Sequence, residues 1–217
     1  MFIGHFGPAL AAKKIDNKPS LGTLFFASQF IDLLWPIFLL LGIESVKIDP
    51  GNTAFTPLDF IYYPFSHSFL GVLIWSVVFG VVYFLIKKKI KSSILLGALV
   101  LSHWILDLIT HRPDLPVTFS NEAKMRFGLW NSIALTMIIE GLIFIIGAYL
   151  YIKTTKATNK RGKAILWSLL IFLSIIYILN VFGPPPPSED SIAVVGLSLW
   201  LLVAWGYWTD RNRINAT

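Results

Sequence analysis

Three residues of one apolar segment have the spacing of a helical metal site. His103, Asp107 and His111 follow one another at four-residue intervals in the stretch SHWILDLITHRPD. At about 100° per residue, this spacing puts the three side chains on one face of a helix, a turn apart, as helical metal sites require. A lone histidine would more simply hydrogen-bond to a neighbouring helix. Three ionisable groups in register favour a metal site, because each costs roughly 2.5 kcal/mol or more inside a membrane.

Two carboxylates lie deep in other apolar stretches. Asp32 and Glu140 each stand eleven residues from the start of such a stretch, which corresponds to about 16 Å along a helix axis. We expect Asp32 to be a metal ligand. For Glu140 three interpretations stay open: a ligand, a proton-relay carboxylate, or a neutral acid that is hydrogen-bonded in the core.

The remaining two histidines lie near the ends of apolar stretches. His67 belongs to PFSHS, where the sequence predicts Ser66 as the N-cap of the next helix. His5 lies in the short apolar segment 2–12. Taken alone, each fits an interfacial position equally well. Because the chain has four histidines and no cysteine, one shared site accounts for all of them.

Imidazole and carboxylate ligands suit Zn²⁺, and also Mn²⁺ or Fe²⁺. Such an ion makes hydroxide from bound water at neutral pH, so the natural reaction is hydrolysis. The candidate ligands are too many for one tetrahedral ion, whereas two ions about 3.5–4 Å apart would use them and would suit phosphoester cleavage. These ligands are His5, Asp32, His67, His103, Asp107 and His111.

Glu140 and Arg112 are the candidate catalytic residues. If Glu140 is not a ligand, it would act as the general base. Arg112 follows His111 at the expected mouth of the site, where a guanidinium would clamp a phosphate or a leaving group. A solvated loop arginine is the competing interpretation of Arg112.

The composition is that of an integral membrane protein. Of the 217 residues, 55% are hydrophobic and 14% are charged, and the mean hydropathy is +0.69. Six stretches are long enough to cross a hydrocarbon core of about 30 Å, which takes about 20 helical residues. We therefore predict an all-α, polytopic membrane bundle that forms a single domain over residues 1–217. The expected spans lie near 21–43, 66–86, 92–111, 129–152, 164–182 and 191–208.

Lysines gather in alternate loops: before the first span, after the second and after the fourth. By the positive-inside rule these loops are cytoplasmic, so both termini are expected on the cytoplasmic side of the plasma membrane. The net charge of +6 reflects these loops, and we expect no nucleic-acid partner. Segment 2–12 is too short to span, so it is either an interfacial helix or a half-helix that enters the bundle. The outer loop 44–65 is long enough to fold back as a lid.

The order of these residues resembles a known family. GH near the start, an aspartate in the first span, PFSHS before the second and HWILDLITHRPD in the third are similar to the predicted membrane-bound metal-dependent hydrolases of the YdjM type. The resemblance covers the chain from its start to the loop after His111. More distantly, the ligand order is similar to that of zinc-dependent phospholipases C and related nucleases, which are helical enzymes with a metal cluster.

The resemblance implies a division of the ligands between ions. One metal would be held by Asp32, His67, His103 and Asp107. His5 and a shared Asp107 would hold another. His111 and Glu140 would supply a further metal only by looser analogy, because their spacing departs from that of the soluble enzymes.

The sequence therefore predicts a membrane hydrolase that acts through a metal-bound water, with one or two ions, on a phosphoester of a lipid or lipid-linked substrate. The alternative is a non-enzymatic transporter that uses the same histidines and aspartates as a proton or metal-ion path. A pathway should place ionisable groups through the whole membrane thickness, whereas these cluster from its middle to its outer half. A third interpretation, haem binding, needs two axial histidines that face each other on different helices.

Overall fold

In the computed structural model, which describes residues 1–120, 122–125 and 127–216, the chain forms an all-α bundle. Within these residues five helices are long and apolar enough to cross a membrane. They are α5 (Phe69–Lys87), α6 (Ile90–Thr110), α7 (Ile133–Thr154), α8 (Lys160–Phe182) and the span Glu189–Arg211, which consists of α9 (Glu189–Leu197) and α10 (Leu199–Arg211). The bent pair α2 (Leu21–Ser28) and α3 (Phe30–Leu40) supplies a sixth if it counts as one span. The predicted helical membrane bundle is confirmed.

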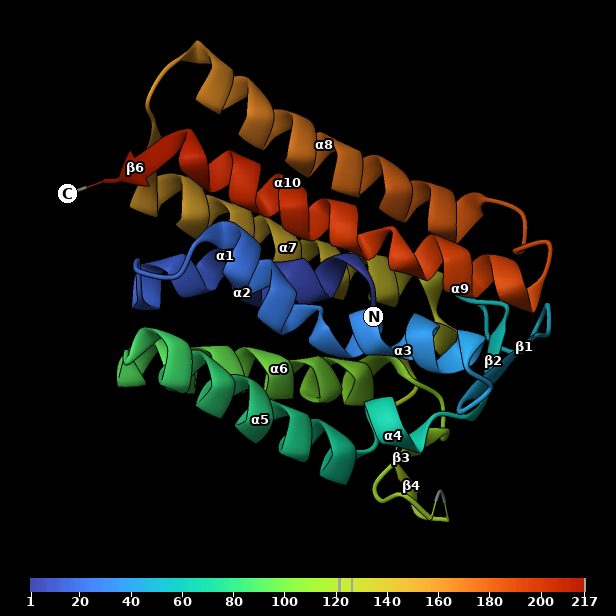
Figure 1. The fold of residues 1–217 in the computed structure, drawn as a ribbon. Helices are drawn as coiled ribbons and strands as arrows, with labels where there is room; N and C mark the ends of the chain where they lie inside the picture. Colours follow the sequence, from blue (N-terminus) through green and yellow to red (C-terminus); the bar gives the residue numbers. More distant parts are fainter. Residues whose placement is uncertain (121, 126, 217) are drawn as a thin grey trace.

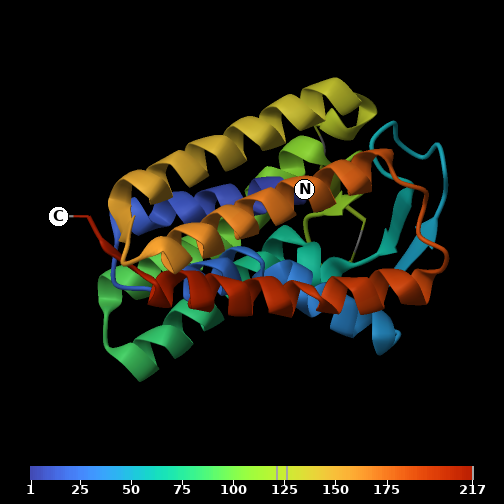
Figure 2. The ribbon, with the colours of Figure 1, turned by 90° about the horizontal axis from the view of Figure 1, so that it is seen from above.

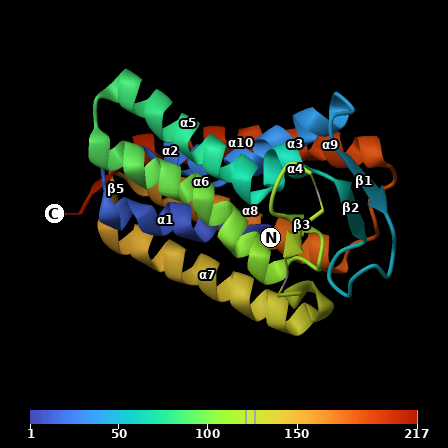
Figure 3. The same ribbon diagram turned by 90° about the horizontal axis from the view of Figure 1, so that it is seen from below.

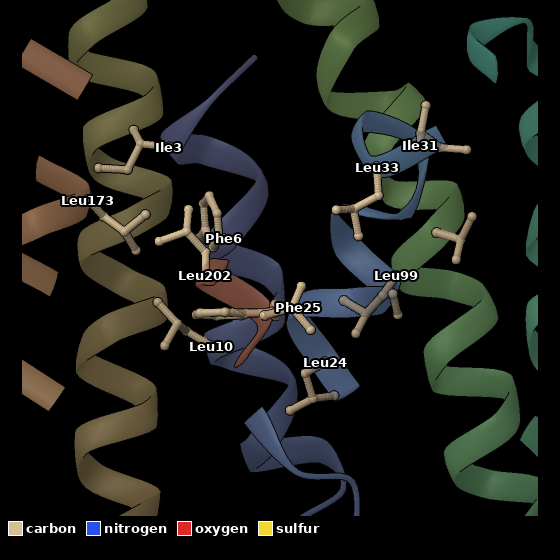
Figure 4. Packing of buried hydrophobic residues seen from close by; sticks show 14 of the residues in the cluster. Ile3, Phe6, Leu10, Leu24, Phe25, Ile31, Leu33, Leu99, Leu173 and Leu202 are labelled. Carbon is tan, nitrogen blue, oxygen red and sulfur yellow. The ribbon is translucent and has the colours of Figure 1, made fainter. Parts of the chain in front are cut away.

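The N-terminal segment lies inside the bundle and not on its surface. It forms the 3₁₀ turn η1 (Ile3–His5) and helix α1 (Phe6–Ile15), which packs between α7 and α2. Phe6 and Leu10 are fully buried, and Figure 4 shows them between Leu173 on one side and Phe25 on the other. The close approach needs glycine: a Cβ on Gly7 or on Gly147 would collide with the backbone of the facing helix.

Strand pairs mark the two ends of the bundle (Figure 1). At one end, β5 (Thr155–Ala157) pairs with β6 (Arg213–Asn215) beside the C-terminus. At the other end lie the hairpin of β1 (Ser45–Ile48) with β2 (Leu58–Tyr62) and the short pair of β3 (Leu115–Pro116) with β4 (Lys124–Met125). The N-terminus is about midway along the bundle (Figures 2 and 3).

The β1–β2 hairpin folds back over the bundle, as the sequence suggested for a lid. Phe60 of β2 packs against Trp35, Tyr63, His111 and Trp130, with ring centroids 5.1 to 6.0 Å apart. Trp130 belongs to the 3₁₀ turn η2 (Leu129–Asn131). An aromatic layer therefore covers this end of α3 and α6.

Two breaks between helices position the candidate ligands Asp32 and His67. The first, a 55° bend between α2 and α3, comes at Gln29 and puts Asp32 in the first turn of α3. The second separates the short α4 (Pro64–His67) from α5, whose N-cap is Ser68, since its hydroxyl accepts from Gly71 N. The prediction that Ser66 caps this helix is wrong, because Ser66 lies within α4 and bonds elsewhere.

Candidate metal centre

The bundle brings histidines and aspartates from four elements into one buried cluster. They come from η1, α3, α4 and α6, which are distant in sequence. Within the described residues, two overlapping groups have ligand atoms that all lie within 4.8 Å of one another. One group is Asp32, His67 and His103, and the other is His5, His103 and Asp107. His103 and Asp107 of α6 and His111, the C-cap of this helix, share one buried side, as their spacing predicted, and each is at most 2% exposed.

Asp107 stands at the centre of the cluster and presents one oxygen to each side. Its Oδ2 lies 3.2 Å from His103 Nε2 and 4.0 Å from His67 Nε2. Its Oδ1 lies 3.1 Å from His5 Nε2 and 3.9 Å from His111 Nε2. A carboxylate in this position can bridge two cations, because each oxygen faces a different pair of imidazoles.

Asp32 completes the first of these two sides. Its Oδ1 lies 3.5 Å from His67 Nε2 and 3.4 Å from His103 Nε2. A tetrahedral ion with bonds of about 2.0–2.2 Å separates its ligand atoms by roughly 3.3–3.6 Å. The spacings of Asp32 from His67 and His103 therefore fit a single divalent ion of zinc size. Asp107 Oδ2 meets this spacing with His103 at 3.2 Å but lies farther from His67, at 4.0 Å. The side chain of Asp32 is 22% exposed, so the cluster reaches the molecular surface there.

Three of the histidines are held from behind by their Nδ1 atoms. His103 Nδ1 lies 2.9 Å from the carbonyl oxygen of Ser28, beside the break between α2 and α3. Because a carbonyl can only accept, His103 carries a proton on Nδ1, and in the neutral ring the lone pair is on Nε2, which faces the cluster. His67 Nδ1 lies 2.7 Å from Ser66 Oγ, and His111 Nδ1 lies 2.9 Å from Asp114 Oδ1. Metal-binding histidines in proteins are oriented by partners of this kind.

The orientation of His103 creates a need for a cation. Its Nε2 has no hydrogen-bond partner among the described residues, yet it faces the oxygens of Asp32 and Asp107. A lone pair that points at two carboxylates is repelled by them unless a proton or a metal ion lies between. The donor set thus fits a divalent metal on geometry and on charge.

His5 joins the cluster through the inserted N-terminal segment. Its ring stacks on that of His103, with centroids 3.6 Å apart and planes 7° apart. The amino group of Met1 lies 2.6 Å from Asp107 Oδ1, so this oxygen contacts both Met1 and His5. His5 Nδ1 is buried without a hydrogen-bond partner in the part of the chain that the structure describes.

Glu140 is buried, but its contacts are with the backbone of the N-terminal segment. Its Oε2 accepts from Phe2 N at 3.0 Å and from Gly4 N at 3.1 Å. Among the described residues, the candidate ligand groups do not include it. Glu140 therefore anchors the turn that carries His5, and its role as a general base stays a prediction.

Arg112 lies at the lid and is engaged by three partners. Its guanidinium donates to Asp59, to Asn52 and, at 3.0 Å from Nε, to Asp114. These bonds tie β2 and its preceding loop to the end of α6, so the predicted phosphate clamp would have to exchange them for a substrate. Burial alone would raise the pKa of Asp114, but its bonds to His111 and Arg112 outweigh burial and leave that pKa below its ordinary value.

Two carboxylates behind the histidines were not predicted as functional residues. Asp114 stands three residues after His111, a spacing that could have indicated the pair. Glu44 bonds to Ser66 across 22 residues of sequence, and its position in a loop carried no such signal. Burial raises the pKa of the Glu44 carboxyl, while the nearby His67 and the hydrogen bonds from Ser66 act in the opposite direction.

Because the comparisons with known proteins found no match, the function has to be inferred from the geometry of this site. No protein-family model, no curated protein and no solved structure matches the chain.

Proposed function

We propose that this protein is a membrane-embedded hydrolase that depends on one or two divalent metal ions, most simply zinc. The observation that supports this most strongly is the direction of the imidazoles. The Nε2 atoms of His5, His67, His103 and His111 converge on Asp32 and Asp107, while partners behind three of them hold the Nδ1 atoms.

Divalent ions bound there would supply an activated water and would polarise a phosphoryl oxygen. Asp107 would connect two ion positions, and the buried histidines would stay neutral so that their lone pairs face inward. Asp32, the most exposed member of the cluster, would lie where a substrate enters. Phosphoester hydrolysis suits this arrangement, because two ions about 3.5–4 Å apart stabilise both the attacking and the leaving oxygen.

A lipid or lipid-linked phosphoester is the substrate class that we propose. The loops after α1, α5 and α7 carry the lysine runs, and all lie at the end of the bundle with β5 and β6. With this end in the cytoplasm, the C-terminus would face inward and the cluster would open toward the outer half of the membrane. The N-terminus lies inside the bundle, where the Met1 amino group contacts Asp107. A headgroup there would reach the cluster while its chains stay among the apolar helices.

The ligand order is also the basis for proposing kinship with the YdjM-type hydrolases. His5, Asp32, His67, His103 and Asp107 occupy the positions that the resemblance requires, and all five belong to the cluster. The same order in zinc-dependent phospholipases C supports the choice of a phosphoester over other hydrolysable bonds.

Metal content by mass spectrometry on detergent-purified protein tests the proposal. We expect one or two equivalents of zinc or manganese in the wild type and none in His103→Ala. Glu189→Gln, which alters an exposed carboxylate at the start of α9, should bind metal like the wild type. Wild-type protein should then cleave a phospholipid or a soluble phosphodiester, and His103→Ala should not. Metal-free wild type would sink the proposal, as would a metal-loaded protein that cleaves no phosphoester.

The second candidate, a proton or metal-ion path, is supported by one observation. A proton on His103 Nε2 would also relieve its repulsion from Asp32 and Asp107. Against it, the candidate ligand groups among the described residues include none at the lysine-rich end, where the buried Lys13 is already paired with Asp210. Flux of protons or zinc into liposomes that contain the protein, abolished in His103→Ala, would favour this candidate.

A further inference from the structure

Glu44 is a buried carboxylate that the proposed hydrolysis does not use. It lies between α3 and β1 and is only 3% exposed. Its backbone is fixed to the end of α3, since the N–H groups of Ile43 and Glu44 both donate to Phe38 O, at 2.9 and 3.2 Å. A carboxylate held this firmly in a buried position needs a partner that justifies its desolvation.

That partner is Ser66, the residue immediately before the candidate ligand His67. Glu44 Oε1 accepts from Ser66 N at 2.8 Å, and Oε2 accepts from Ser66 Oγ at 2.6 Å. Ser66 Oγ in turn lies 2.7 Å from His67 Nδ1. A chain of hydrogen bonds therefore runs from Glu44 through Ser66 to the back of His67.

The chemistry of the three groups gives this chain a direction. A hydroxyl has one proton, and an ionised carboxylate can only accept. Ser66 Oγ therefore donates to Glu44 and must accept from His67 Nδ1–H. His67 Nε2 is left with a free lone pair, and it faces Asp32 Oδ1 at 3.5 Å.

We propose that Glu44 is a positioning residue of the metal centre, which acts through Ser66 to hold His67 in the tautomer and ring orientation that bind metal. This inference rests on the metal site of the proposed function. His103 needs no such device, because the carbonyl of Ser28 can only accept. A serine alone could donate to His67 as readily as accept, and Glu44 removes that ambiguity.

Replacement of Glu44 by glutamine should reverse the chain. An amide places an NH₂ group at one of the two carboxylate oxygens. If it faces Ser66 Oγ, it donates there, Ser66 donates to His67 Nδ1, and the proton moves to His67 Nε2. If it faces Ser66 N, two donors oppose each other. The first orientation is favoured because it avoids these opposed donors, and in it His67 loses its fixed lone pair.

The test is zinc affinity of the full-length protein in detergent, measured by competition with a chromophoric chelator after removal of metal. Glu44→Gln should weaken binding at one site by about 10–100-fold, the range seen when partners behind a ligand are removed. Asp49→Asn, which alters an exposed carboxylate just after β1, should bind zinc like the wild type. With Co²⁺ as the probe, the visible absorption of Glu44→Gln should show one altered coordination sphere.

The double variant separates positioning from a general effect on folding. Because Glu44 acts through Ser66, Glu44→Gln in a Ser66→Ala background should weaken zinc binding no further than Ser66→Ala alone. Additive losses would overturn the proposal, and so would wild-type zinc affinity in Glu44→Gln. If Glu44→Gln lowers the melting temperature of the metal-free protein, the zinc affinity of Ser66→Ala is the deciding measurement. Wild-type zinc affinity in Ser66→Ala then overturns the proposal. Wild-type protein that binds no zinc would instead remove the proposed function, and this role of Glu44 with it.

Discussion

Two of the buried charged clusters among the described residues are built differently. At the lysine-rich end, Lys13 is 3% exposed, and its Nζ donates at 2.9 Å both to Asp210 Oδ2 and to the carbonyl of Pro19. Asp210 Oδ1 accepts from Tyr151 at 3.1 Å. The histidine cluster is equally buried, but its inward Nε2 atoms face carboxylates, and that of His103 has no hydrogen-bond partner among the described residues.

The difference shows that burial of charge does not by itself identify a functional site. The Lys13 cluster is closed: each charge has the partner that its desolvation requires, and the result is a tie between α1 and α10. The histidine cluster is held from outside. The Met1 amino group and His5 bond to one oxygen of Asp107, but His103 Nε2 has no hydrogen-bond partner among the described residues. Polar atoms that are oriented but not satisfied are what a cation would bind.

The largest effect should come from the centre of the histidine cluster. Asp107→Asn removes the charge that faces both sides and puts an amide donor against histidine lone pairs. We expect metal affinity to fall by about 100-fold or more, beyond the loss typical of an outer partner. Metal titration of stripped protein measures this, and full occupancy in Asp107→Asn would contradict the two-sided role of Asp107.

The closed cluster should respond in stability and not in metal binding. Lys13→Met leaves Asp210 without its buried cation, which should cost roughly 3 kcal/mol, the low end for a broken buried pair because Asp210 is 17% exposed. Thermal unfolding in detergent measures the loss, with the exposed Lys14→Met as the matched control.

Stability and zinc affinity of the Lys13 variants also test whether the Lys13 cluster and the histidine cluster are independent. Lys13→Met with Asp210→Leu should recover much of the stability, because no charge is left unpaired. Zinc affinity should match the wild type in all of these variants. A loss of zinc binding in Lys13→Met would mean that the two clusters are coupled.

Glu140→Gln tests whether Glu140 anchors the N-terminal segment or transfers a proton. As an anchor it holds η1 through Phe2 N and Gly4 N, so the substitution should weaken metal binding near His5 by about tenfold. Kinetics with a cleaved phosphoester provide the second measurement. A fall in kcat of about 10²–10⁴-fold with unchanged metal affinity would instead establish the general base.

The smallest effect is expected at Arg112. Its bonds to Asp59 and Asp114 lie partly exposed at the lid, so Arg112→Gln should lower stability by about 1 kcal/mol or less and leave metal content unchanged. Thermal unfolding and metal analysis test this. A large rise in KM for a phosphoester with little change in stability would show that Arg112 contacts the substrate.

The sequence by itself determined five long apolar helices and the shared side of His103, Asp107 and His111, but not the break that divides the first expected span into α2 and α3. Both depend on local regularities: the length of an apolar run and the rotation per residue of a helix. It also pointed to Asp32, His5 and His67 as members of one site, but through residue type and resemblance, since no helical period relates residues on different elements.

Only the tertiary structure decided how these residues meet. His5 reaches the cluster because Gly7 and Gly147 let α1 approach α7, and Asp32 reaches it from a helix that bends at Gln29. The structure also turned Glu140 toward the N-terminal backbone and placed Glu44 behind His67. Such contacts join residues far apart in the chain, so they depend on how helices pack and rotate against one another, which local propensity and hydropathy do not specify.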